Sequence, residues 1–208
     1  PVIFEENLYG KLQVEHSGVL DSDRELFSVL ACVLASEIRK KKLQEYLLRL
    51  SYQDQLTGIR NNTSYIRMLN QLLERPVPVG VAFADLNGLK YLNDTYGHEY
   101  GDQALRHLAE VSMEYFAKDQ LYRVSGDEFV IICPEVQEEV FIRQAQLLKE
   151  RLKQEEQGLA AFGYLWNDGT TAADRLLHGA ERLMYQEKQQ HYRDSTRRVQ
   201  ECPGYAQA

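Results

Sequence analysis

Residues 121–133 read LYRVSGDEFVIIC, two short apolar runs on either side of the polar sequence Ser125-Gly126-Asp127. Short apolar runs bounded by turn residues are typical of paired β-strands. Glycine at the first central position of a two-residue loop indicates a type II′ turn, in which that position needs a positive φ. The stretch therefore predicts a hairpin of strands 121–124 and 129–133, with Asp127 at its tip.

The elements around this hairpin alternate regularly. Apolar residues spaced three or four apart indicate helices, short apolar runs indicate strands, and Pro76 and Pro78 end the first helix. In chain order the predicted elements are a helix at 63–75, a strand at 77–86, a helix at 102–116, the hairpin, a helix at 136–156, a strand at 159–166 and a helix at 172–190. From the strand at 77–86 onward the order is βαββαβ, which predicts an α+β, ferredoxin-like fold.

The first 53 residues form a separate part of the chain. Apolar runs at 2–4 and 8–14 predict the last strands of a module, residues 1–20, whose beginning lies upstream of Pro1. Residues 21–53 hold no Gly or Pro and predict one long helix. Positions that alternate by three and four, as in a coiled-coil seam, carry apolar residues except where Ser36 and Lys40 interrupt the seam: Leu26, Val29, Val33, Leu43, Leu47 and Leu50. Packing on the upstream module and dimerisation both remain open for its first half, and the second half favours dimerisation. We divide the remainder into a second domain at 54–193 and a tail at 194–208.

The composition excludes several classes of protein. The 208 residues carry a net charge of −7, and the largest basic cluster is the short run 39–42, so binding to polymeric nucleic acid is not indicated. The three cysteines lie far apart and suggest free thiols in a reducing compartment. No apolar stretch approaches the about 20 residues of a membrane helix. We expect a cytoplasmic location with no membrane segment in this chain.

Two carboxylates are predicted to converge. In a split-βαβ sheet the first and third strands are antiparallel neighbours, which places Asp85, at the end of one, beside Asp127, at the start of the other. Two adjacent carboxylates repel each other unless a cation lies between them, and oxygen ligands favour Mg²⁺ or Mn²⁺. Taken alone, such a pair is more often two solvated turn residues.

The segment after this strand has features of a phosphate and purine site. Residues 85–90 leave the strand in a turn whose backbone N–H groups, together with Lys90, suit phosphate. Asn93 and Asp102 offer an amide and a carboxylate, a pair that matches the donors and acceptors of guanine. Asp102 also opens the predicted helix at 102–116, where its alternative role is an N-cap.

Four motifs in order carry a family resemblance: Asp54-Gln55-Leu56-Thr57-Gly58 with Asn61; Asp85 to Lys90 with Asn93-Asp94; Gly97-His98 with Gly101-Asp102; and Arg123-Val124-Ser125-Gly126-Asp127-Glu128-Phe129. Over residues 51–193 the chain resembles the GGDEF family of diguanylate cyclases. The resemblance implies a palm-like βαββαβ domain of the nucleotidyl-cyclase type.

It also implies that two GTP molecules, one on each subunit of a homodimer, condense into cyclic di-GMP with release of two pyrophosphates. By position, it implies metal ligation of Mg²⁺ or Mn²⁺ by Asp85, the backbone carbonyl of Leu86 and Asp127, and catalysis by Asp85, Asp127 and Glu128. It implies substrate binding by Gly88, Lys90, Asn93, Asp102, Gly126 and Lys188.

Departures from the family pattern raise an alternative. Gly88 and Tyr192 differ from it, and a catalytically degenerate GTP-binding regulatory domain that acts through a partner is the second interpretation. The family's product-inhibition motif, Arg-x-x-Asp, is replaced by residues 116–119, Phe-Ala-Lys-Asp, so no product inhibition is expected there. The first 50 residues resemble the end of a GAF sensory module that runs into a signalling helix, which implies an upstream sensory domain.

Overall fold

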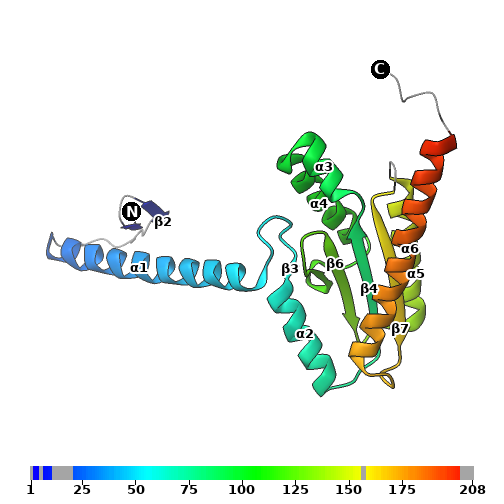
Figure 1. Ribbon diagram of the computed structural model, residues 1–208. Helices are drawn as coiled ribbons and strands as arrows, with labels where there is room; N and C mark the ends of the chain where they lie inside the picture. The colour runs from blue at the N-terminus through cyan, green and yellow to red at the C-terminus, as the bar shows by residue number, and fades with distance from the viewer. Residues whose placement is uncertain (1, 5–6, 11–20, 156–157, 202–208) are drawn as a thin grey trace. The chain divides into compact units, whose positions relative to one another are not determined.

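The computed structural model describes residues 2–4, 7–10, 21–155 and 158–201 (Figure 1). The chain divides into two compact units, with the boundary after Ser51. In the first unit, strands β1 (Val2–Phe4) and β2 (Asn7–Gly10) pair antiparallel, and helix α1 spans Asp21–Tyr52. The predicted long helix is confirmed. The predicted strand at 8–14 is observed only over Asn7–Gly10, and residues 11–14 lie outside the described residues.

The predicted seam of α1 is exposed to solvent within this chain. Between 41% and 61% of the surface of each of its apolar residues is accessible, namely Leu26, Val29, Val33, Leu43, Leu47 and Leu50. Within the described residues, no helix combines the length and the apolar character needed to cross a bilayer.

The second unit is built on one five-stranded sheet. Its strands are β3 (Arg60–Asn61), β4 (Val79–Leu86), β5 (Leu121–Arg123), β6 (Glu128–Pro134) and β7 (Ala160–Asn167), in the order β3-β5-β6-β4-β7. Its helices are α2 (Asn62–Glu74), α3 (Leu89–Tyr96), α4 (His98–Met113), α5 (Glu138–Gln154) and α6 (Ala173–Glu201), with a short 3₁₀ turn at Lys118–Gln120. Apart from the parallel pair β3 and β5, the strands pair antiparallel. The predicted α+β, βαββαβ fold is confirmed.

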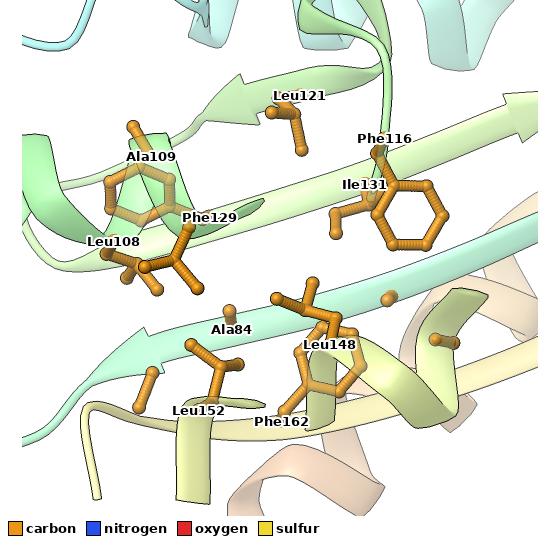
Figure 2. Packing of buried hydrophobic residues seen from close by; sticks show 14 of the residues in the cluster. Ala84, Leu108, Ala109, Phe116, Leu121, Phe129, Ile131, Leu148, Leu152 and Phe162 are labelled. Carbon is orange, nitrogen blue, oxygen red and sulfur yellow. The ribbon is translucent and has the colours of Figure 1, made fainter. Parts of the chain in front are cut away.

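Strand β4 is buried on both faces because helices cover both sides of the sheet. All eight of its residues are buried. Residues such as Ala84 belong to a core with α4 and α5, and Figure 2 shows Phe129 and Ile131 of β6 with Leu148 of α5 in this core. Residues such as Phe83 belong to a second core with α2 and α6. A continuous apolar run is what a strand between two helical layers requires.

The helix predicted at 102–116 is corrected by the structure. Two helices, α3 and α4, fill the connection from β4, and α4 already begins at His98. Gly97 separates them with φ of 90°, a backbone conformation that side chains disfavour. Asp102 therefore lies in the second turn of α4, and its predicted role as an N-cap is wrong.

The predicted type II′ hairpin turn is also wrong. Strand β5 ends at Arg123 and β6 begins at Glu128, so the connection is longer than two residues. The Glu128 N–H donates to the Ser125 carbonyl at 3.3 Å, and Gly126 does not have a positive φ. The turn is therefore a β-turn closed by this hydrogen bond, but it is not of type II′. Contacts from outside the turn, which the next section describes, also hold it.

The last helix is longer than predicted. α6 runs from Ala173 to Glu201, beyond the predicted end at Gln190 and through the first part of the segment interpreted as a tail. The sequence has no Gly or Pro between Gly179 and Pro203, so nothing in it stops the helix earlier.

Helix α6 packs against β7 (Figure 1). A Cβ atom placed on Gly163 of β7 would lie 2.2 Å from the Met184 backbone nitrogen and 2.4 Å from the Ala180 carbonyl oxygen. Only glycine fits at this contact. Because Lys188 follows one turn after Met184, this close approach also sets the position of Lys188.

We predict that Gly163→Ala lowers the free energy of unfolding by about 2 kcal/mol, because backbone atoms of α6 must move to admit the methyl group. Guanidinium unfolding measures the change. Gly126→Ala is the control: no atom lies within 4 Å of a Cβ there, and we expect a change below about 0.5 kcal/mol. Equal stability of the two variants would contradict the close packing of α6 on β7.

Candidate active site

Asp85 is a buried carboxylate near the end of β4. Only 4% of its surface is accessible. The Lys188 ammonium group of α6 donates to Asp85 Oδ1 at 2.6 Å. Burial raises the pKa of Asp85; the hydrogen bond from Lys188 opposes this rise and the charge of Asp127 adds to it, and the pKa lies above its usual range. The structure therefore keeps an acid where its ionised form needs positive compensation.

Two further carboxylates lie at the same end of the sheet. The Leu86 N–H donates to the Asp127 carbonyl at 3.1 Å, which ties the hairpin loop to the end of β4. Glu128 is paired in register with Asp85. Burial raises the pKa of Glu128, and the charges of Asp85, Asp127 and Glu181 raise it further. In the described part of the chain, no three His, Cys, Asp or Glu side chains form a ready-made metal site.

A cavity of about 460 Å³ opens beside these carboxylates. It is lined by Asp85, Glu128, His178, Glu181, Arg182, Met184, Tyr185 and Lys188. Most of these residues belong to α6. Of the residues on α6, only Lys188 was predicted from the sequence as a site residue. Their spacing contained the signal: positions 178, 181, 185 and 188 follow one another at intervals of three or four residues and so share one face of a helix.

The segment after β4 forms the predicted turn at residues 87–88 and then starts a helix at Leu89. Gly88 has a left-handed conformation with φ of 68° and is the N-cap of α3. No atom lies within 4 Å of a Cβ placed on Gly88, so the space in front of the helix start is open. Lys90, in the first turn of α3, is exposed. A helix start with open space and a nearby lysine is suited to bind phosphate.

Asn93 and Asp102 lie on the two consecutive helices α3 and α4. A Cβ atom on Gly101 would be 2.0 Å from Asn93 Oδ1, so glycine at 101 lets the Asn93 amide rest against α4, next to Asp102. Asp102 is half-buried. The structure brings these two side chains to neighbouring positions, and neither of them lines the cavity beside Asp85.

Arg123 connects the hairpin loop to the start of the unit. Its Nε and Nη2 donate to the Gly126 carbonyl at 3.0 and 2.7 Å, and its Nη1 donates to Asp54 at 3.1 Å. Asp54 also accepts from the Thr57 N–H and hydroxyl at 2.9 and 2.7 Å, so these bonds hold residues 54–57 in a turn. The bond to Arg123 was missed because the two residues are 69 positions apart in the sequence.

The position of the family's product-binding arginine is part of the core. Phe116 is 3% exposed, and its ring lies 5.9 Å from the ring of Phe141. Asp119 forms a 4.0 Å ion pair with Arg60. A buried phenyl ring at 116 offers no charge to a phosphate ligand.

The palm-like sheet with carboxylates at the hairpin defines the class of the domain, and the comparisons agree. The family described as diguanylate cyclase, GGDEF domain, matches residues 51–194. The chain therefore belongs to the GGDEF family.

Named relatives share part of the chain. The response regulator PleD of Caulobacter vibrioides is 33% identical over 118 residues, which are 51% of this chain and 26% of PleD. The diguanylate cyclase DgcS of Shewanella oneidensis is 31% identical over 178 residues, 75% of this chain and 58% of DgcS. The cyclic di-GMP phosphodiesterase PdeR of Escherichia coli is 30% identical over 141 residues, 66% of this chain and 21% of PdeR. The chain thus spans only a part of each of these proteins.

Solved structures show the same fold. The coiled coil and GGDEF domain of DgcB from Caulobacter crescentus aligns with a TM-score of 0.65 at 20% identity and covers 80% of this chain and 95% of that one. The GGDEF domain of FimX from Pseudomonas aeruginosa aligns with a TM-score of 0.60 at 22% identity, over 67% of this chain and 95% of that one.

We predict that Asp54→Asn lowers the unfolding free energy at neutral pH by about 1 kcal/mol, a figure reduced for the partial exposure of the ion pair. Burial raises the pKa of Asp54, but the bonds from Thr57 and the charge of Arg123 outweigh it, so the pKa is lowered. The stabilisation is therefore complete above the unfolded pKa and is lost as the pH falls through the lower, folded pKa.

Chemical denaturation of both proteins from neutral pH to about pH 3 tests this, with convergence of the two curves expected at the acid end. Asp168→Asn is the control for the threonine bonds, since Asp168 accepts from the N–H and hydroxyl of Thr170. These bonds lower the pKa of Asp168 as well, but no arginine charge adds to them, so we expect a smaller pH-dependent loss than for Asp54→Asn. A difference between wild type and Asp54→Asn that does not depend on pH would exclude the ionised pair.

Proposed function

We propose that this chain carries a diguanylate cyclase that joins two GTP molecules into cyclic di-GMP. The observation that supports it most is the meeting of Asp85, Asp127 and Glu128 at the hairpin of a GGDEF domain. DgcS, a relative over 75% of this chain, is named as a diguanylate cyclase. Since GTP is a cytoplasmic nucleotide, we place this domain in the cytoplasm.

The donor atoms at this site fit Mg²⁺ or Mn²⁺. Asp85 and Asp127 offer carboxylate oxygens, and the backbone carbonyl of Leu86 lies between them in the chain. Hard oxygen donors and excess negative charge favour these cations over softer metals. When bound, the cation would neutralise charge on the phosphate oxygens and orient them. Burial of Asp85 adds to the need for a cation, because its ionised form has lost most of its water.

The nucleotide would lie between the helix start at Gly88 and the hairpin. The first backbone N–H groups of α3, with Lys90, would bind phosphate oxygens, and Lys188 would contact the terminal phosphates from α6. Gly126 has open space above it, which suits close approach of the nucleotide to the loop. Asn93 and Asp102 would read guanine, whose N1–H and exocyclic amine are donors that adenine does not offer in that arrangement.

The reaction needs two copies of the domain. In each step the ribose 3′-oxygen of one nucleotide bonds to the α-phosphorus of the other, the bond from that phosphorus to the β-phosphate oxygen breaks, and pyrophosphate leaves. Asp127 would accept the proton of the 3′-hydroxyl, and Glu128 would support it. Two such steps close the ring.

The exposed apolar seam of α1 supports a homodimer. Two copies paired along Leu26, Val33, Leu43 and Leu50 would cover side chains that are open to water in one chain. This pairing would bring two catalytic domains into one molecule and would let an upstream sensory domain, of the GAF type, control how they face each other.

We predict that the purified dimer, incubated with GTP and Mg²⁺, forms cyclic di-GMP and pyrophosphate, measured by liquid chromatography. Asp127→Ala should lower the rate by at least about a hundredfold while circular dichroism stays unchanged. GTP binding without product would instead favour the regulatory interpretation. That outcome has to be tested, since PdeR shows that proteins named as phosphodiesterases also match this chain.

We further predict that cyclic di-GMP does not inhibit the enzyme through residues 116–119, because Phe116 is buried and Asp119 is paired with Arg60. Calorimetric titration with cyclic di-GMP should give the same result for wild type and Asp119→Ala. Tight binding that is lost in Asp119→Ala would refute this prediction.

A further inference from the structure

A lysine occupies the position at which the site needs a cation. Lys188 Nζ lies 2.6 Å from Asp85 Oδ1, and the two side chains are 22% and 6% exposed. Glu128 from β6, Asp127 from the loop and Glu181 from α6 add negative charge around the pair. Ionised carboxylates this close and this dry are stable only with a positive partner. In the protein without nucleotide, the ammonium group of Lys188 is that partner.

A divalent cation that binds Asp85 must compete with this ammonium group. The ammonium has contact with the same oxygen atom that a metal would use, and two positive groups repel each other at that distance. The described residues also lack a ready-made set of three acidic or other metal-binding side chains. Binding of free metal is therefore opposed until Lys188 has another partner.

The ammonium group of Lys188 has space to move away from Asp85. Its side chain lines the cavity of about 460 Å³ beside Asp85, and four methylene groups let its ammonium move while α6 stays fixed against β7. Triphosphate oxygens in this space would accept hydrogen bonds from it as well as Asp85 does.

We propose that the ammonium group of Lys188 neutralises Asp85 in the absence of nucleotide. When a triphosphate binds, this ammonium group moves from Asp85 to the phosphate oxygens, and the metal takes its place on Asp85. The inference rests on the proposed function for the identity of the ligand, a metal–nucleoside triphosphate. It makes Lys188 a positioning residue with two alternating partners, and it makes binding of metal and of triphosphate cooperative. Free metal alone then cannot hold the site in its loaded form.

The test measures Mn²⁺ affinity of the full chain at mildly alkaline pH, from the electron paramagnetic resonance signal of free Mn²⁺. Each protein is titrated alone and with a GTP analogue that has a methylene group between the α- and β-phosphorus atoms. Lys188→Met removes the charge and keeps the apolar stem, and Lys188→Arg keeps the charge. Lys149→Met is the matched control, because Lys149 also pairs with a carboxylate of α6, Glu187, and is 29% exposed.

Without nucleotide, we expect Lys188→Met to bind Mn²⁺ at least about tenfold more tightly than wild type, because a unit positive charge beside Asp85 is gone. Lys188→Arg and Lys149→Met should match wild type. The analogue should raise the affinity of wild type by at least about tenfold and that of Lys188→Met by much less.

Two results would overturn the proposal: Mn²⁺ binding by folded Lys188→Met that is no tighter than in wild type, or wild-type affinity that the analogue does not change. The second needs no variant, so it holds even if Lys188→Met fails to fold, which thermal unfolding checks. Failure of the proposed function has a different signature. In that case wild type makes no cyclic di-GMP, whether or not the Mn²⁺ affinities follow the expected pattern.

Discussion

The structure of this domain depends on how it keeps a carboxylate at the edge of its core. Asp85 lies one residue before the end of a strand whose residues are all buried. Glu128 pairs with it in register, and the ammonium group of Lys188 donates a hydrogen bond to it. Lys188 reaches it because α6 lies directly on β7, where Gly163 leaves room for the helix backbone. The packing of α6 on β7 therefore determines whether Lys188 can neutralise Asp85. A change in this packing also changes the charge balance of the site.

The hairpin loop obeys a second constraint, since contacts from outside it add to the hydrogen bonds of its own backbone. Leu86 holds it through the Asp127 carbonyl, and Arg123 holds it through the Gly126 carbonyl. Arg123 is in turn held by Asp54, just after the boundary between the two units. Neighbouring segments can thus hold the loop in a fixed position and still leave it accessible to a substrate. The bond between Arg123 and Asp54 also links the loop to the start of the domain.

Much of the fold was predictable from local patterns. Apolar runs and the prolines at 76 and 78 indicated the order of strands and helices, and the order βαββαβ predicted the neighbouring positions of the strands that carry Asp85 and Glu128. The predictions of helix start and turn type were wrong at positions where a glycine sets the backbone conformation. Gly97 starts a new helix at His98, so Asp102 is not a cap, and Gly126 does not adopt the positive φ of the expected turn. A glycine permits several backbone conformations, and its neighbours in space choose among them.

By itself, the sequence determined the class of domain, because element order follows from periodicity along the chain, and it indicated the family and the candidate site residues through the resemblance of four ordered motifs. Only the tertiary structure decided which side chains form pairs, namely Lys188 with Asp85 and Arg123 with Asp54, and that one face of α6 lines the cavity. The partners are 69 positions apart in the pair of Arg123 and Asp54 and 103 positions apart in the pair of Lys188 and Asp85, so no local pattern contains them. The physical reason is that burial and charge compensation are properties of three-dimensional neighbours, which appear only when strands and helices pack.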